Sequence, residues 1–199
     1  MNEVLETIKN RRSIRKYLPK QIKNENLDII LESAIYAPSG GNNQPWHFTV
    51  VQNREFIDFM NEESKKLMVK DKELMDLLNA ESKKLPDFEE RITTLGKSEN
   101  FNIFYDAPTV IVVSGKKETV SSFADCCAAI QNMLIAAESL DIGSCWVGLA
   151  RFFFEDPENI EKLNLPPNYE PYYAVCLGYK DSSNNKAPKR NKNVVNYIK

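Results

Sequence analysis

The stretch Ala37-Pro-Ser-Gly-Gly-Asn-Asn-Gln-Pro-Trp-His-Phe48 joins a segment of helical periodicity to a predicted strand at Trp46–Val51. Its paired glycines permit positive φ and close backbone approach, and a proline stiffens each end. The amide side chains of Asn42 and Gln44 can both donate and accept hydrogen bonds. This combination suits a loop that lines the edge of a planar heterocycle. An ordinary helix-to-strand turn would use the same residue types, so the loop alone does not decide between these two readings.

The segment before this loop is predicted to be an amphipathic helix. Its apolar residues follow the 3.6-residue period of a helix: Leu27, Ile30, Leu31, Ala34 and Ile35. Asn24 or Asn26 is a suitable N-cap. We therefore expect the loop to hang between two rigid elements.

Further towards the N-terminus, a short amphipathic helix leads into a basic segment around Ser13. Arg11, Arg12 and Arg15 surround that hydroxyl. Arginine side chains bind phosphate through charge-assisted, bidentate hydrogen bonds, and a hydroxyl or backbone N–H can complete such a site. A solvated basic turn is the alternative reading.

Beyond the loop, the β-branched run Ala107–Ser114 predicts a strand that is buried on both faces. Ser122 and Asp125 have the spacing of a capping box with a short acid, and they open a helix that reaches about Leu140, with Gly143 just past its end. That helix is apolar nearly all round, so it should be the most buried helix or one that packs against a partner subunit.

Two more strands are predicted, at Ser144–Leu149 and Pro171–Leu177. Gly148 interrupts the first of them where a backbone N–H could face a ligand. Asn193–Tyr197 near the C-terminus is a possible edge strand. Residues 61–100 are heavily charged, and two readings remain for them: a helical excursion or a lid over a site.

The length of 199 residues suits one domain, and the net charge of −2 hides an asymmetry. Residues 1–23 carry seven basic and two acidic side chains, and residues 180–199 carry six basic and one acidic. Such ends are either solvated tails or two parts of one anion site. Nucleic-acid binding is a third hypothesis, but the body between the ends is acidic and shows no continuous basic stripe.

Neither a signal peptide nor a membrane span is recognisable, and the four cysteines have no CxxC spacing. We therefore expect a cytoplasmic protein. His47 is the only histidine, and no HExxH, Walker, EF-hand or GxGxxG motif occurs. A chain so poor in catalytic side chains would most naturally leave the reaction to a bound cofactor.

Taken in order, these segments resemble the nitroreductase family of FMN enzymes. The motifs that carry the resemblance are the loop quoted first and Arg11-Arg-Ser-Ile-Arg15, Tyr105-Asp-Ala-Pro108, Gln131-Asn-Met-Leu-x-Ala-Ala137, Ile142-Gly-Ser-Cys-Trp146 and Pro188-Lys-Arg190. The resemblance implies an α+β fold with a mixed central sheet surrounded by helices, formed by residues 1–199 as one domain. It also implies an intertwined homodimer in which the C-terminal extension 180–199 crosses to the partner.

The resemblance also implies residue roles. The FMN phosphate would be bound by Arg11, Arg12 (through its backbone), Ser13, Lys189 and Arg190. Arg15 would lie near the ribityl chain or the N1–O2 edge of the flavin. The isoalloxazine ring would be lined by Pro38, Ser39, Asn42 and Gln44, in part from the partner, and its N5–O4 edge would face Trp146, Val147 and Gly148.

The implied reaction passes hydride from NADH or NADPH to flavin N5, with no catalytic side chain, and then reduces a nitroaromatic, a quinone or a similar acceptor. The alternative function is a flavin-binding protein that stores, presents or destroys flavin. Two departures from the family pattern concern the acceptor: no pyrimidine-edge pair is assignable within residues 61–80, and Arg151-Phe-Phe-Phe154 could narrow the substrate side.

Overall fold

The computed structural model describes residues 2–70, 87–181 and 187–199. Its helices and strands are α1 (Glu3–Asn10), α2 (Asn24–Ile35), η1 (Gly40–Asn42), β1 (Trp46–Val51), α3 (Arg54–Lys70), α5 (Phe88–Lys97), β2 (Thr109–Lys116), α6 (Ser122–Ser139), β3 (Ile142–Val147), η2 (Gly148–Ala150), α7 (Arg151–Phe154), α8 (Pro157–Glu161) and β4 (Tyr169–Tyr179). The predicted α+β class is confirmed.

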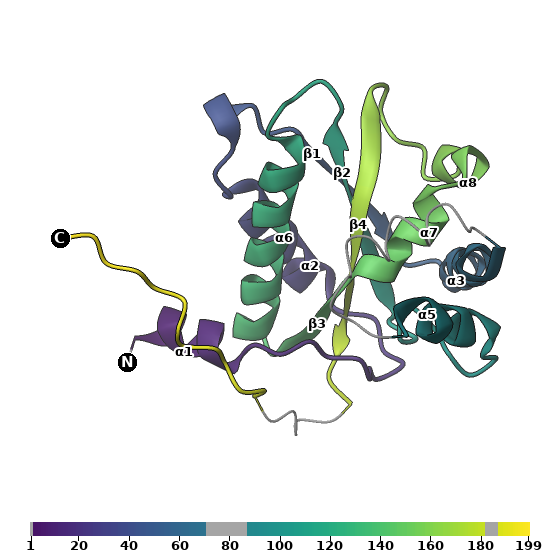
Figure 1. Cartoon of the computed structure of the whole chain (residues 1–199), viewed down its shortest axis with the longest axis horizontal. Helices are drawn as coiled ribbons and strands as arrows, with labels where there is room; N and C mark the ends of the chain where they lie inside the picture. The colour runs from purple at the N-terminus through teal and green to yellow at the C-terminus, as the bar shows by residue number, and fades with distance from the viewer. Residues whose placement is uncertain (1, 71–86, 182–186) are drawn as a thin grey trace.

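One four-stranded sheet of order β1-β2-β4-β3 lies between two layers of helices, as Figure 1 shows. All three strand pairings are antiparallel. The parallel component of the expected mixed sheet is a single bridge between Ser13 and Ser144, outside the strands. A parallel bridge at that place means that the N-terminal segment runs alongside β3.

The sheet is covered on both faces, which gives the protein two apolar clusters. On one face α2 and α6 pack against Ile111, Val113 and Val175, and on the other α3, α5 and α7 pack against Val110 and Val112. Successive β2 side chains therefore enter opposite clusters, as expected for a strand without a solvent face. The prediction of a doubly buried strand is confirmed.

Three local predictions were wrong. The predicted capping box at Ser122 is absent, because the N-cap of α6 is Ser121 and its side chain makes no capping hydrogen bond. α2 begins after Lys23 without a side-chain cap, so neither Asn24 nor Asn26 provides one. Gly143, expected just past the end of α6, lies inside β3, and Asp141 adopts the left-handed turn with φ 56°. A Cβ on Gly143 would come within 2.9 Å of Ile14, so this glycine is required by close packing.

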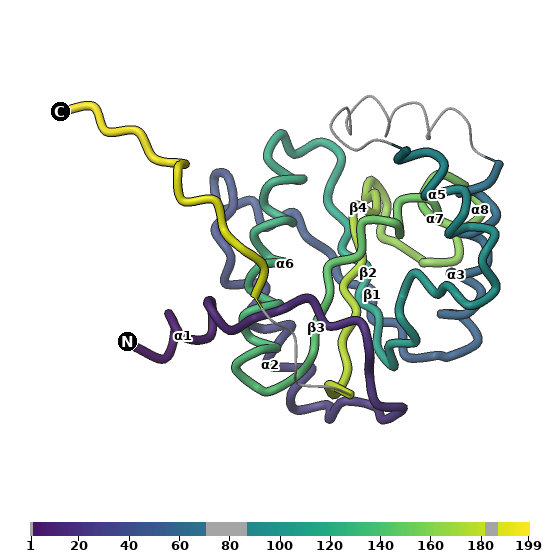
Figure 2. The backbone as a smooth tube through the Cα atoms, turned by 60° about the horizontal axis from the view of Figure 1, so that its bottom comes forward, coloured from purple at the N-terminus to yellow at the C-terminus, as the bar shows by residue number. Residues whose placement is uncertain are grey.

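The C-terminal extension leaves the body of the protein. Its described part, residues 187–199, contains neither helix nor strand, and Val194, Val195, Tyr197 and Ile198 are exposed. The N- and C-termini lie on the same side of the molecule in both views (Figures 1 and 2). The predicted crossing of Asn193–Tyr197 to a partner stays a prediction. Within the described ranges, no helix is long and apolar enough to cross a membrane.

Candidate anion and ring-binding site along strand β3

The basic N-terminal segment is fixed to the edge of the sheet. Ile14 N–H donates to Ser144 O at 2.9 Å, and Tyr17 pairs with Lys180. The Ile14 side chain is 5% exposed and packs against Gly143. In an extended segment neighbouring side chains point in opposite directions, so anchoring Ile14 turns Ser13 and Arg15 the other way. The sheet edge therefore holds these polar side chains in a fixed place.

The three arginines of this segment have different environments. The Arg12 guanidinium folds back, and its Nη1 donates to the carbonyl oxygens of Lys9, Asn10 and Arg11 at 2.7, 3.0 and 2.7 Å. This contact places a positive charge at the negative C-terminal end of α1. Arg12 Nη1 is consequently committed to the fold, and Arg12 Nε is buried without a hydrogen-bond partner, so a ligand could use the Arg12 backbone but not Nη1.

Arg15 lies against an aromatic ring and a buried thiol. Its guanidinium carbon is 5.6 Å from the centroid of the Tyr105 ring, a cation–π distance. Burial lowers the pKa of Arg15, and the Tyr105 hydroxyl and nearby Cys145 outweigh that effect, so the net pKa is raised. Burial raises the pKa of the Cys145 thiol, while the positive charge of Arg15 opposes the rise. Both groups therefore keep their ordinary charge at neutral pH.

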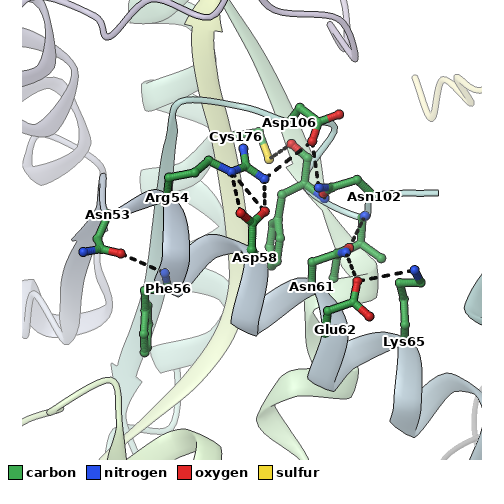
Figure 3. Close-up of polar contacts among 12 residues, drawn as sticks. Asn53, Arg54, Phe56, Asp58, Asn61, Glu62, Lys65, Asn102, Asp106 and Cys176 are labelled. Carbon is green, nitrogen blue, oxygen red and sulfur yellow. Dashed lines mark hydrogen bonds and ion pairs between the residues drawn. The ribbon is translucent and has the colours of Figure 1, made fainter. Parts of the chain in front are cut away.

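Tyr105 is held by an unusual turn, residues 102–106, in front of β2. Tyr105 and Asp106 both have φ 55°, which non-glycine residues rarely adopt. Asn102 donates to Asp106 at 2.9 Å, and Arg54, which pairs with Asp58, also approaches Asp106 at 3.5 Å (Figure 3). α3 thus helps to fix the residue on which Arg15 rests.

Buried polar residues of α3 contribute to the same turn. Asn61 Oδ1 accepts a 2.9 Å hydrogen bond from Ile103 N–H, and Asn61 Nδ2 donates to Glu62 (Figure 3). Lys65 is 8% exposed and lies 3.5 Å from Glu62. The expected pyrimidine-edge pair within residues 61–80 is not identified: the Asn61 carboxamide is already engaged, and residues 71–80 lie outside the described part.

At the far end of β3 the chain opens into space. Trp146 packs edge-on against Tyr173 with ring centroids 5.1 Å apart, and Val147 is buried. Gly148 is exposed, and a Cβ built on it would meet nothing within 4 Å. The backbone of Gly148 is therefore accessible, and the ring-edge role of residues 146–148 stays a prediction.

A cavity of about 560 Å³ lies beside this end of β3. Its walls combine aromatic and charged side chains: Lys117, Phe123, Arg151, Phe154, Glu155, Ile160, Glu170, Pro171, Tyr172 and Tyr173. The expectation that the whole run 151–154 narrows the substrate side is too broad. Phe152 and Phe153 are fully buried core residues, and only Arg151 and Phe154 reach the cavity.

The glycine-containing loop lies at the other end of the helical layer. Gly41, Asn42 and Gln44 have φ of 59°, 56° and 45°. Gln44 N–H donates to Ser39 Oγ at 3.1 Å, and Gln44 Nε2 donates to Asn42 Oδ1 at 3.2 Å. Asn42 and Gln44 are exposed, as is Pro38, and Ser39 is partly so. The loop therefore has a defined shape and presents polar groups outward.

The predicted site residues form three groups in one chain: the β3 edge, the glycine-containing loop and the C-terminal tail. Arg11, Ser13 and Arg15 share the β3 edge with Trp146–Gly148, whereas the loop lies beside the first turn of α6, far from α1 (Figure 1). Lys189 and Arg190 lie exposed in the C-terminal tail, where Arg190 donates to Pro188 O at 3.1 Å. One chain does not bring the tail or the loop against Arg11.

Sequence reasoning did not assign a site role to Tyr105 or Asp125. Tyr105 lies in a quoted motif, but nothing local indicates that Arg15, ninety positions earlier, contacts it. Asp125 was interpreted as part of a capping box with Ser122; its carboxylate accepts from the Ser121 hydroxyl and also from Gly40 N–H. The rings of His47 and Tyr169 lie edge to face with their centroids 5.7 Å apart.

Comparisons with known proteins agree on the family. The model of the Nitroreductase family matches residues 8–179. A nitroreductase with bound FMN from Bacteroides fragilis superposes with a TM-score of 0.84 at 35% identity over all of both chains. One from Desulfitobacterium hafniense, also with bound FMN, gives 0.81 at 27% identity over all of both chains. An NAD(P)H-dependent FMN reductase of Bacillus subtilis is 27% identical, over 99% of this chain and 74% of its own. The chain therefore belongs to the nitroreductase family.

Proposed function

We propose that this protein is an FMN-dependent oxidoreductase that passes electrons from NADH or NADPH to a nitroaromatic, a quinone or a similar small acceptor. The observation that carries the proposal is the placement of Arg11, Ser13 and Arg15 along the same strand edge that ends at the open Gly148. A phosphate group at one end and a flat ring at the other would match this edge.

The phosphate end of the edge fits a dianion. Arg11 and Ser13 are partly exposed and lie beside Ser144, while the Arg12 side chain is engaged with backbone carbonyls. Arg12 would therefore contribute its N–H, and Arg11 would make the charge-assisted contact. Lys189 and Arg190 would complete the site if the tail of a second chain, or a rearranged tail of the same chain, approaches it.

The ring end of the edge fits an isoalloxazine. Gly148 leaves space where any side chain would project, and Trp146 is braced by Tyr173 behind it. Bound FMN would supply hydride acceptance from the nicotinamide and electron transfer to the acceptor. Arg15, kept positive and oriented by Tyr105, would stabilise negative charge that develops on the pyrimidine part of the ring.

The separate position of the loop supports a homodimer as the working form. Pro38, Ser39, Asn42 and Gln44 lie at the opposite end of α6 from α1, so a loop of one chain would line the ring bound by another. The exposed apolar residues of the tail, Val194 to Ile198, fit a segment that is covered in an assembly.

The test is to purify the protein, record its visible spectrum, and titrate stripped protein with FMN. We expect a yellow protein that binds one FMN per chain and oxidises NAD(P)H when a nitroaromatic or quinone is added. FMN binding with negligible turnover across such acceptors would favour a flavin-storing or flavin-presenting function. A colourless protein that takes up no FMN would refute both.

A further inference from the structure

Asp125 is the only carboxylate among the buried residues that the structure describes. It lies in the first turn of α6 with 7% of its surface exposed. A buried carboxylate is unfavourable unless it is paired or hydrogen-bonded, so its partners indicate why it is there. None of the roles described above uses this residue.

The partners of Asp125 belong to the glycine-containing loop and to the helix start. Both carboxylate oxygens accept from Gly40 N–H, each at 3.2 Å, and Oδ2 also accepts from the Ser121 hydroxyl at 2.8 Å. The predicted capping box would have turned this carboxylate towards its own helix start. It does contact the helix start, through the Ser121 hydroxyl, and it also reaches a backbone group 85 positions earlier in the chain.

The contact leaves little freedom to the loop. A Cβ on Gly40 would lie 2.4 Å from Ser121 Oγ and 3.0 Å from Ser121 Cβ, so any other residue at this position would displace the Ser121 side chain. The residues that follow include Asn42 and Gln44, both in the left-handed region that side chains disfavour. Such a conformation persists only where surrounding contacts hold it. Asp125 supplies the contact at the first residue of η1.

We propose that Asp125 is a positioning residue: its carboxylate holds the Ser39–Gln44 loop in the shape that presents Asn42 and Gln44 to the flavin. The part of this inference that concerns flavin rests on the proposed function. We call the contact of the Asp125 carboxylate with Gly40 N–H and the Ser121 hydroxyl the clamp. The clamp does not depend on the proposed function. Loss of the carboxylate would let the left-handed residues relax and would move both amides.

A matched control exists on the same helix. Asn132 Nδ2 donates to Ser33 O at 3.0 Å, which joins α6 to α2 without touching the loop. Asn132→Ala removes a polar contact between α6 and α2 and leaves the contacts of the loop in place. It therefore reports what general loosening of α6 does to flavin binding.

The experiment compares Asp125→Ala, Asp125→Asn and Asn132→Ala in the full chain. Amide hydrogen exchange of Gly40 in flavin-free protein measures the clamp, and FMN titration measures the site. We expect Asp125→Ala to speed Gly40 exchange and to weaken FMN binding, each about tenfold or more, as loss of a charge-assisted bond implies. Asp125→Asn keeps the shape and one acceptor oxygen, so it should lie between Asp125→Ala and the wild type. Asn132→Ala should leave both quantities within about twofold of the wild type, since changes away from the site are usually small.

Several results would overturn the inference. Gly40 exchange unchanged in a folded Asp125→Ala protein would show that the carboxylate does not hold the loop. Faster exchange with unaltered FMN affinity would show that the held shape does not serve the flavin. If Asn132→Ala weakened FMN binding as much as Asp125→Ala does, the effect of Asp125→Ala would reflect a general loss of stability and not the loop contact. If wild-type protein binds no FMN, the proposed function and the flavin part both fail, and Gly40 exchange still decides on the clamp.

Discussion

The guanidinium of Arg15 rests 5.6 Å from the centre of the Tyr105 ring, although the two residues are ninety positions apart. Tyr105 in turn lies in a left-handed turn that α3 holds through Asn61 and, more weakly, Arg54. Arg15 is thus oriented by Tyr105, and the turn of Tyr105 is held by residues of α3. That arrangement links the helices of one layer to a site built on the edge strand.

Replacing Tyr105 should alter the flavin more than the fold. Tyr105→Phe keeps the ring under Arg15 but removes the hydroxyl, and Tyr105→Leu removes both. We expect the flavin midpoint potential to become more negative in the order wild type, Phe, Leu, because a less oriented cation stabilises reduced flavin less. Potentiometric titration of the FMN-loaded variants measures this. Identical potentials in all three would show that Tyr105 does not act through Arg15.

Replacement by alanine should affect stability at Gly143, inside β3, and FMN binding at Gly148, just past the end of β3. Gly148→Ala meets no atom within 4 Å, so unfolding free energy should change by no more than about 0.5 kcal/mol. Its methyl group would nevertheless occupy the ring end of the site and weaken FMN binding. Gly143→Ala would press on Ile14 at 2.9 Å and should cost about 1–3 kcal/mol of stability.

Denaturant unfolding and FMN titration of both variants separate the two effects. A destabilised Gly148→Ala protein would contradict the open environment of that position. Unchanged FMN affinity in stable Gly148→Ala would remove this residue from the ring site.

The first two arginines should also differ. Arg11→Ala should weaken FMN binding by about 1–3 kcal/mol, because the phosphate loses a charged partner, while the fold is little affected. Arg12→Ala removes three hydrogen bonds to the end of α1 and should mainly destabilise the N-terminal segment. Thermal unfolding and FMN titration distinguish them. Stronger loss of FMN in Arg12→Ala than in Arg11→Ala at matched folding would reverse the assignment.

The C-terminal extension can be removed without cutting the sheet. A truncation after Gly178 would remove Tyr179, which pairs with Ile142, and Lys180, which contacts Glu138 at 3.2 Å. Ending the chain after Asp181 keeps these contacts. We expect that shorter protein to fold, to lose the dimer and to bind FMN weakly, as judged by light scattering and titration. A dimer that retains FMN would show that the tail neither crosses nor binds.

Much of this fold is predictable from local patterns, because periodicity reports burial. The β-branched run before Ser114 and the nearly all-apolar helix after Ser122 were both placed correctly in the core. Local patterns do not name the partner of a side chain. The sequence around Asp125 does not indicate that its carboxylate contacts Gly40. The sequence around Phe152 does not show whether this side chain lies in the core or lines a substrate cavity. Those outcomes depend on contacts between distant segments.

The prediction of the site was limited in the same way. Spacing suggested that Arg11, Ser13 and Arg15 act together, but their alignment along β3 required the bridge between Ser13 and Ser144. The sequence also does not show which of the three arginines folds back onto the backbone carbonyls of its own segment, as Arg12 does. Residue type indicated the chemistry, and only the fold shows which groups remain available for it.

Titration of stripped protein with FMN, beside the Arg11→Ala and Gly148→Ala variants, probes the β3 edge at both of its ends. We expect saturable quenching of flavin fluorescence at one FMN per chain, and weaker binding in each variant while the fold persists. No quenching by the wild type, or equal affinity in all three proteins, would mean that this strand edge does not bind the flavin.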